Sequence, residues 1–282
     1  MQTEGKGRCS IIVSVFNEAK ILPRSIAALL NGLPQDAELI FSCNGCTDDS
    51  VAVINRLAGD RVRILDLPKR GKTYAMREAE RVARYFPRFF VDADIVFLGR
   101  DFPALIRALR EPGTQIVSPR MVHDMTGCTW ASRAINSTWR RLPIGKQGYI
   151  QCVIGISETG RRNWGELPDV MADDLYMLSH IKPSARNIVE SVQQTSFPPR
   201  TFWNHVGVRS RFIKGNRKIS EMGLAKAGNP TQKSALLKLL FNPMHTVPTV
   251  VYIIHRLLAE RIARREIGHA DGSWFTDSST RS

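Results

Sequence analysis

The sequence predicts an α/β protein in which a mostly parallel sheet is flanked by helices and followed by a helical C-terminal extension. The main observation is that short β-branched or apolar segments alternate with helical segments over the first 120 residues, through four successive pairs. This alternation is typical of parallel strands whose connecting helices cover both faces of a sheet. A second observation is the helical apolar spacing of residues 235–266, which is interrupted near Pro243 and Pro248 and predicts two C-terminal helices.

The individual elements follow from local signals. Asn31-Gly32 ends the first helix, and the run 47–50, Thr-Asp-Asp-Ser, opens the second with N-cap chemistry. Apolar runs bounded by turn residues predict strands at 9–15, 38–43, 62–67, 89–96, 115–118 and 185–192, with helices at 21–30, 47–57, 75–86 and 102–109. We expect residues 120–165 to be irregular with short helices, 168–180 to turn into a helix, and 197–229 to form a basic, loop-rich segment.

The pattern predicts one α/β domain over residues 1–230, a helical extension over 231–267 and a disordered polar tail over 268–282. The start of the sequence carries no signal-peptide core, and no apolar run reaches the ~20 residues that cross a bilayer. Five cysteines, an odd number without a regular framework, indicate a reducing compartment. We therefore expect a cytoplasmic protein.

The charge of the chain favours anionic partners. Its formal net charge is +14, and residues 200–282 hold 14 Lys and Arg against 5 Asp and Glu. Such a chain attracts nucleic acid, an anionic membrane surface or phosphorylated small molecules. The sequence contains no RNP-type or zinc-finger motif, so nucleic acid is not an expected partner.

Polar sequence follows each of the first four predicted strands. The four ends are Phe16-Asn17-Glu18, Cys43-Asn44-Gly45-Cys46-Thr47-Asp48, Lys69-Arg70-Gly71-Lys72 and Asp92-Ala93-Asp94. Parallel strands bring these ends to one edge, where open α/β sheets bind ligands. On a strand, Asp92 and Asp94 would point to the same side, and a divalent cation with oxygen ligands would relieve their repulsion. Arg70 and Lys72 suit phosphate oxygens, so the edge fits a metal-bound diphosphate.

Two common phosphate-binding motifs are excluded. Gly71-Lys72-Thr73 resembles the end of a P-loop, but Asp66 stands where that motif requires Gly. The first strand is not followed by G-x-G-x-x-G, so the dinucleotide fingerprint is also missing.

The ordered motifs resemble those of family 2 glycosyltransferases with the GT-A fold, a Rossmann-like fold of nucleotide-diphospho-sugar transferases. The likeness covers about residues 9–180, and its specificity lies in the order of four motifs at four strand ends: residues 13–18, 44–49, 70–72 and 92–94. The resemblance implies an inverting, non-processive enzyme that uses a nucleotide-diphosphate sugar, Mg²⁺ or Mn²⁺, and a hydroxyl acceptor. Whether that acceptor is lipid-linked stays open.

The resemblance also implies roles for single residues. Asp92 would contact the ribose or the metal, and Asp94 would coordinate the metal directly. The residues expected at the nucleotide and its phosphates are Phe16, Asn17, Glu18, Asn44, Asp48, Arg70, Lys72 and Asp92. Arg209, Arg211 and Lys214 are further candidates for phosphate contact, with a solvated basic loop as the alternative, and His205 is a candidate metal ligand, with a structural histidine as the alternative.

Asp173-Asp174 opens a predicted helix over residues 175–181. The family usually has Glu-Asp here, and its second acid is the general base, which would be Asp174. An attacking hydroxyl must lose a proton, and a carboxylate can accept it. The alternative is that both acids simply favour a helix N-terminus.

The chain departs from the family pattern at two places. Cys43 stands where the family commonly has an Asp that contacts the base, which leaves the nucleobase open. Val208 stands where the Gln of the processive Gln-x-x-Arg-Trp motif would be, which favours a single transfer. Cys43 and Cys46 also form a C-x-x-C, so a thiol–disulfide oxidoreductase is an alternative function, and a non-catalytic module that binds anions or nucleic acid is another.

The C-terminal segment carries an apolar stripe and separate basic residues. The stripe comprises Val250, Val251, Ile254, Leu257, Leu258 and Ile262, and the basic residues are Arg256, Arg261, Arg264 and Arg265. Such a helix packs its stripe on the domain or lies on an anionic membrane. Attachment to the inner face of the membrane is therefore an open alternative.

Overall fold

The computed structural model describes residues 7–146, 150–224 and 230–266. It divides into two compact units: unit 1 contains residues 1–122 and 149–196, and unit 2 contains residues 123–148 and 197–282. The sequence-based division at residue 230 cuts the chain at a different place, and the predicted tail at 268–282 lies outside the described residues.

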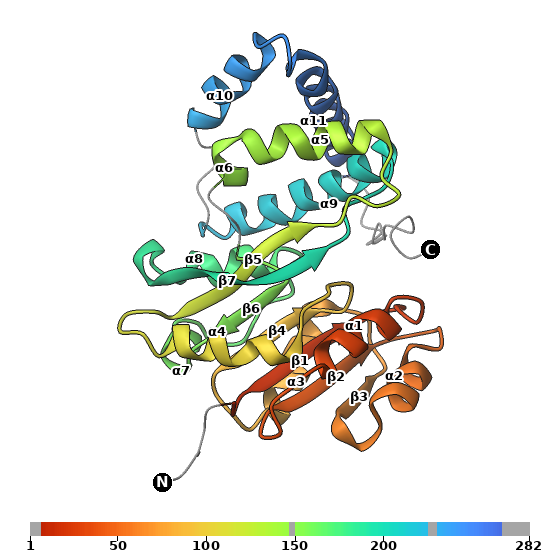
Figure 1. Cartoon of the computed structure of the whole chain (residues 1–282), viewed down its shortest axis with the longest axis vertical. Coiled ribbons are helices and arrows are strands. Elements are labelled where there is room, and N and C mark those ends of the chain that lie inside the picture. Colours follow the sequence, from red (N-terminus) through yellow and green to blue (C-terminus); the bar gives the residue numbers. More distant parts are fainter. Residues whose placement is uncertain (1–6, 147–149, 225–229, 267–282) are drawn as a thin grey trace. The chain divides into compact units, whose positions relative to one another are not determined.

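Unit 1 is built on a seven-stranded sheet with the strand order β3-β2-β1-β4-β6-β5-β7 (Figure 1). β1 pairs in parallel with β2 and β4, and β2 with β3, whereas β6 runs antiparallel to both β4 and β5. The predicted fold class is thus confirmed. The strands are β1 Ser10–Val15, β2 Glu38–Asn44, β3 Arg63–Leu67, β4 Arg88–Asp92, β5 Ile116–His123, β6 Val153–Ile156 and β7 Arg186–Ser196.

Helices cover the sheet of unit 1 on both faces. Alternate side chains of β1 and β2 enter the core with α1, α2 and α4, while on the opposite face the Ser42 hydroxyl donates to the Ala75 carbonyl of α3. The helices are α1 Leu22–Leu30, α2 Ser50–Ala58, α3 Lys72–Val82, α4 Phe102–Leu109, α7 Glu158–Arg161 and α8 Asp173–Ser179, with 3-10 turns at Gly59–Arg61, Gly99–Asp101 and Pro183–Ala185.

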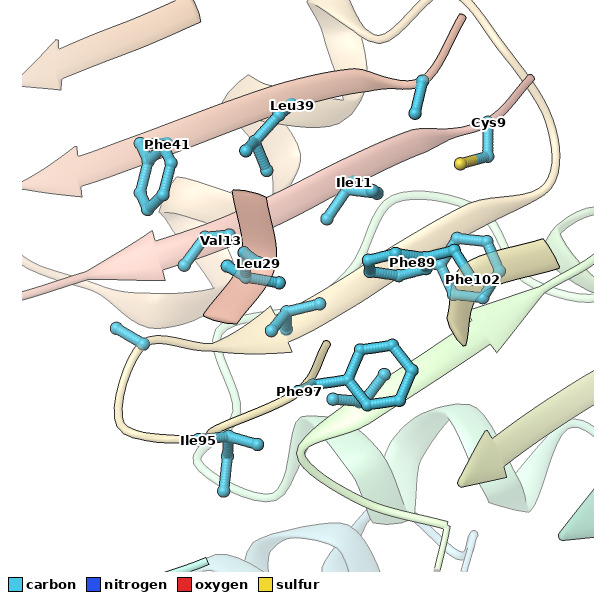
Figure 2. Close-up of a cluster of buried hydrophobic side chains, with 14 of the residues drawn as sticks. Cys9, Ile11, Val13, Leu29, Leu39, Phe41, Phe89, Ile95, Phe97 and Phe102 are labelled. Carbon is cyan, nitrogen blue, oxygen red and sulfur yellow. The ribbon is translucent and has the colours of Figure 1, made fainter. Parts of the chain in front are cut away.

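The core of unit 1 supports the strand that carries the acidic motif. Phe89 of β4 packs edge-on against Phe102, with 5.0 Å between ring centroids, and Phe97 packs on the same ring at 5.0 Å (Figure 2). All three rings are fully buried. Aromatic packing on Phe102 therefore anchors the chain both before the acidic motif, through Phe89, and after it, through Phe97.

Unit 2 is helical. α11 packs against both α5 and α9, and Ile135, Leu142 and Tyr252 form a small buried cluster among these helices. No helix in the described parts of the chain is long and apolar enough to cross a membrane. The helices are α5 Trp130–Arg141, α6 Pro143–Lys146, α9 Phe202–Glu221, α10 Pro230–Leu240 and α11 Thr246–Glu266.

Three predictions about local structure were wrong. Residues 120–165 are more regular than expected, because they contain the 12-residue helix α5 and the four-residue strand β6. The segment 197–229 was expected to be loop-rich but contains the 20-residue helix α9, which starts at the N-cap Thr201. The two predicted C-terminal helices are present as α10 and α11, and the chain between them contains Pro243. Pro248 does not break a helix, because it lies in the first turn of α11, where its missing N–H is not needed.

Candidate active site

The first two loops of the sheet edge are joined by side-chain hydrogen bonds. The Asn17 amide donates to the Thr47 hydroxyl at 3.0 Å, and the Thr47 backbone N–H donates back to Asn17 Oδ1 at 2.8 Å. Asn17 has φ +53°, a left-handed conformation that Asn tolerates better than most residues. Asp48 Oδ2 accepts from the Ala19 N–H, and the Ser50 hydroxyl accepts from the Glu18 N–H. The two loops therefore form one rigid surface.

Asn44 connects three strand ends. Its amide donates to the Val15 carbonyl at 2.7 Å, and its Oδ1 accepts from the Gly71 N–H at 3.0 Å. Next to it, Gly45 has φ +69°, and a Cβ there would lie 3.1 Å from the backbone nitrogen of Arg70. A glycine is needed at this position because the second and third loops approach so closely.

Arg70 and Phe16 form the rim of the same edge. The Arg70 guanidinium carbon lies 4.4 Å from the centroid of the Phe16 ring, which is cation–π geometry.

Burial acts to raise the pKa of Asp48 in the second loop, but hydrogen bonds from Ser50 and Ala19 outweigh it and hold that pKa below its usual range. The structure thus gathers Phe16, Asn17, Glu18, Asn44, Asp48 and Arg70, all expected at the nucleotide, into one connected group.

Lys72 lies between two carboxylates from distant parts of the sequence. Its Nζ is 2.8 Å from Asp92 Oδ1 and 3.0 Å from Asp173 Oδ2. Lys72 begins α3, Asp92 ends β4 and Asp173 begins α8, so three separate elements place these charges together. Burial opposes the charge on Lys72, but Asp173 and Asp92 raise the pKa of Lys72 well above its usual value. The ammonium group therefore stays protonated.

The acidic pair at the start of α8 lies in a poorly hydrated environment. Asp173 is buried, and burial raises its pKa even though Lys72 acts to lower it. Burial, followed by the charge of Asp173, raises the pKa of Asp174 to about 6, with Lys72 again opposing the shift. Asp174 Oδ1 accepts from the Leu175 backbone N–H at 2.7 Å. A carboxyl group that titrates near neutral pH can accept a proton under physiological conditions.

Asp94 does not lie on the strand. β4 ends at Asp92, and the exposed Asp94 sits in the turn that follows, so strand alternation does not determine its direction. The Cys152 carbonyl accepts from the Asp92 N–H at 2.9 Å, and after burial itself the charges of Asp92 and Asp94 contribute to raising the pKa of the Cys152 thiol. Asp174 acts on the same thiol in the same direction. The acidic residues of the two motifs thus converge around Cys152.

Sequence reasoning missed Cys152 and the residue that holds its loop, Gln194. Cys152 has φ +64°, and Gln194 is fully buried. Gln194 Oε1 accepts from the Val153 N–H, and its Nε2 donates to the Gln151 carbonyl, each at about 3.0–3.1 Å. No local pattern reveals this arrangement, because it depends on Gln194 of β7 reaching the start of β6, more than 40 residues earlier in the sequence.

The donor atoms at this edge suit a hard divalent cation. Among the described residues, no group of three or more His, Cys, Asp or Glu side chains is placed to hold a metal by itself. Mg²⁺ is commonly held by one or two carboxylates together with substrate phosphates. The carboxylates of Asp92 and Asp94 fit that mode of binding.

The remaining candidates belong to unit 2. Arg211 and Lys214 lie on α9 and not in a basic loop. His205 is buried in the same helix, with its Nε2 2.9 Å from the Ser132 hydroxyl and 3.3 Å from the Asn136 amide. These contacts are those of a structural histidine.

The two cysteines of the C-x-x-C differ in environment. Cys43 is fully buried in the core, and its hydrogen bond with Cys46 and its burial raise the pKa of its thiol. The same hydrogen bond lowers the pKa of Cys46 to about 7. Cys46 also donates to the Val15 carbonyl at 3.6 Å. The pair is thus part of the packing between β1 and β2.

Comparison with known proteins adds independent findings. The family model described as Glycosyl transferase family 2 matches residues 10–163, just over half of the chain. No curated protein matches the sequence.

Several solved structures share the fold. The mannosyltransferase PcManGT from Pyrobaculum calidifontis, in complex with GDP-Man and Mn²⁺, has a TM-score of 0.61 and 16% identity, over 93% of this chain and 78% of that chain. Glucosyl-3-phosphoglycerate synthase from Mycobacterium tuberculosis, with Mn²⁺, UDP and glucosyl-3-phosphoglycerate, has a TM-score of 0.53 and 15% identity, over 78% and 82%. S. aureus TarS 1-349 has a TM-score of 0.51 and 12% identity, over 95% and 94%. At these identities the likeness establishes the fold.

Proposed function

This chain belongs to glycosyl transferase family 2 and is a glycosyltransferase, and we propose that it moves a sugar from a nucleotide-diphosphate donor to a hydroxyl acceptor with inversion and with the help of a divalent cation. The observation that carries the proposal is the charge cluster at the sheet edge. Lys72 holds Asp92 and Asp173 within 3.0 Å, and beside them Asp174 has a pKa of about 6. Strongly perturbed pKa values that arise from burial and a specific charge partner cluster at functional sites.

We propose that Asp94 and Asp92 hold Mg²⁺ or Mn²⁺ together with the donor diphosphate. When bound, such a cation stabilises the negative charge that develops on a departing diphosphate. The Mn²⁺ in complexes of two proteins of the same fold supports a divalent metal, and the GDP-Man and UDP in those complexes support a nucleotide-sugar donor. The choice between Mg²⁺ and Mn²⁺ is left to experiment.

The loop surface would bind the rest of the donor. Phe16, Asn17 and Glu18 with Asn44 and Asp48 offer a ring and polar atoms for the base and ribose, and Arg70 and Lys72 offer cations for the phosphates. Arg211 and Lys214 on α9 remain proposed phosphate contacts.

Asp174 would act as the general base. The acceptor oxygen attacks the anomeric carbon on the side opposite the diphosphate, its proton passes to the Asp174 carboxylate, and the bond from the anomeric carbon to the phosphate oxygen breaks with its electron pair on the diphosphate. Because its pKa is about 6, Asp174 is ionised at pH 7 but still basic enough to take the proton. After the burial of Asp174 itself, the charge of Asp173 would help to raise this pKa.

A panel of nucleotide sugars, screened by thermal shift with and without Mn²⁺, tests the proposal. A ligand that binds only the folded state raises the melting temperature by mass action. We expect one donor to raise it when Mn²⁺ is present and to have little effect in its absence. Asp94→Asn should abolish the metal-dependent shift, whereas Asp60→Asn, a change at an exposed acid far along the sequence, should leave it intact.

The outcome that contradicts the proposal is a donor-induced shift that ignores both Mn²⁺ and Asp94→Asn. Inversion is tested separately, by NMR of the anomeric proton in the first-formed product. A cytoplasmic location stays a prediction of the sequence, and the chemical class of the hydroxyl acceptor stays open.

A further inference from the structure

α11 packs on unit 2 through an unusual face. Its buried side chains are Thr249, Tyr252, His255, Ala259 and Ala263, which recur at helical spacing and face α5 and α9. Two of the five are small alanines and two are polar. Of the apolar stripe expected from the sequence, Val250, Ile254 and Leu257 are exposed, whereas Val251, Leu258 and Ile262 are partly buried.

The outward face of α11 carries the larger apolar side chains. Val247, Val250, Ile254 and Leu257 are all exposed, and their spacing places them opposite the buried face. Isolated exposed apolar residues are ordinary, but a helix that buries alanines and exposes Ile and Leu reverses the usual pattern. This face therefore suits contact with something other than water.

The apolar surface continues into the segment that joins α10 to α11. Phe241 is 80% exposed and Met244 is 83% exposed, and Leu237 of α10 is also open to solvent. Phe241 and Met244 lie in this connection, and Val247 follows in the first turn of α11. We refer to Leu237, Phe241, Met244, Val247, Val250, Ile254 and Leu257 as the apolar ridge.

Basic side chains extend the apolar ridge. Arg261 and Arg265 are exposed on the same outward face, one and two turns beyond Leu257. Residues 230–266 hold six Lys and Arg against two Glu. Apolar side chains beside an excess of positive charge are typical of helices that lie in the interface of an anionic bilayer.

We propose that the apolar ridge docks unit 2 on an anionic phospholipid surface, with the α10–α11 connection inserted among the acyl chains and Arg261 and Arg265 at the phosphates. The charge decides between this occupant and a second copy of the chain. Two copies with a net charge of +14 each repel, whereas anionic lipid supplies both apolar and negatively charged contact. The inference concerns unit 2 alone and holds whatever the donor sugar is.

Vesicle flotation with the full-length protein tests the proposal. We expect binding to vesicles of 30% phosphatidylglycerol in phosphatidylcholine and little binding to pure phosphatidylcholine. Phe241→Ser with Met244→Ser should lower the partition coefficient at least tenfold, because both side chains would lose their acyl contacts. Arg261→Gln with Arg265→Gln should lower it by about 30-fold at low salt, since each basic side chain near such a surface contributes roughly a fivefold factor.

Matched controls distinguish the effect of the apolar ridge and its arginines from general effects of surface charge and hydrophobicity. Leu57→Ser removes an exposed apolar side chain of unit 1, and Arg56→Gln with Arg107→Gln removes two exposed cations there. Neither should change the partition coefficient more than twofold, and the melting temperature of every variant should match that of the parent. Equal binding to neutral vesicles, no binding at all, or a dimer in sedimentation velocity that Phe241→Ser with Met244→Ser dissociates would each overturn the proposal.

Discussion

Two buried acids of unit 1 lie against cations. Glu80 accepts from both Arg88 and Arg161, and Asp173 lies 3.0 Å from Lys72. In unit 2 the buried ionisable side chain of His255 is treated differently, because neither of its ring nitrogens makes a hydrogen bond of ordinary geometry within the described residues. Unit 1 thus pairs these buried carboxylates with cations, whereas unit 2 buries an imidazole that must stay uncharged.

This difference has a functional meaning. A carboxylate balanced by one lysine has a pKa that depends on that lysine, so the cluster around Lys72 can be tuned for proton transfer. The neutral imidazole on the buried face of α11 offers no comparable chemistry, and it lowers stability only when it is protonated. The charges that can do chemistry gather at the strand ends of unit 1, while unit 2 presents an apolar outward surface.

Asp174→Asn should have the largest effect on activity, because it removes the proposed base from the charge cluster of unit 1. An amide cannot accept the proton of the acceptor hydroxyl, so kcat should fall by about 10²–10⁴-fold. The measurement is initial rate with the donor identified by thermal shift, and Asp60→Asn is the control. Donor binding with Mn²⁺ should survive the substitution. A rate within threefold of the parent would remove Asp174 from the proposed mechanism.

Lys72→Met should remove the positive charge that lies between Asp92 and Asp173 in unit 1. Lys72 lowers the pKa values of Asp173 and Asp174, so its loss raises both. Since the ionised form of Asp174 is the base, activity rises with pH through that pKa, and the acidic limb of kcat/KM should move from about pH 6 to higher pH. Lys72→Arg should restore much of the original profile.

Stability supplies a second readout for the same substitution. Removing one partner of a buried ion pair leaves the other charge uncompensated, and with Lys72 about a third exposed we expect a loss of about 2–3 kcal/mol at pH 7. Chemical denaturation measures it. An unchanged pH profile together with this loss would mean that Lys72 is purely structural.

The sequence predicted the sheet edge of unit 1 well because its signals are local. Apolar runs ending in polar motifs located β1 to β4, and the separate motifs containing Asn17, Asn44 and Arg70 do lie together. The acidic start of α8 was also recognised from Asp173-Asp174. Each of these features depends on residues that are neighbours in the chain.

The rest could not be predicted because it depends on pairings between distant segments. β6 has only four residues, and its Gly155 is required because a Cβ there would lie 2.4 Å from the Phe89 ring. Cys152, directly before β6, has a left-handed conformation that no local sequence signal indicates. In unit 2, the long polar helix α9 was mistaken for loop because its charge obscured the helical pattern.

Gln194→Leu tests whether complete pairing of buried polar groups matters in unit 1. The substitution leaves the Val153 N–H and the Gln151 carbonyl without this partner in a dry site, which should cost about 1–3 kcal/mol. It should also lower kcat more than it changes KM for the donor, because the Cys152 carbonyl that holds the Asp92 N–H lies in the same loop. Gln193→Leu, at the exposed neighbouring position, is the matched control. Loss of stability with unchanged kcat would make Gln194 a packing residue only.

His255→Leu tests the opposite situation in unit 2, and its effect should appear only in acid. Burial, then the charge of Arg209, lowers the pKa of His255 to about 4, against an ordinary value of 6.5. The unfolded chain therefore binds more protons between these values, so His255 reduces stability as pH falls from about 6.5 toward 4.

At pH 5 this cost is about 2 kcal/mol, and at pH 7.5 it is close to zero. Calorimetry at both pH values should show that His255→Leu stabilises the protein at pH 5 relative to the parent, whereas His245→Leu, at a partly exposed position, should not. Equal stabilisation at both pH values would mean that the imidazole is costly even when neutral. The contrast between the units would then lie in how polar groups are packed rather than in how charge is balanced.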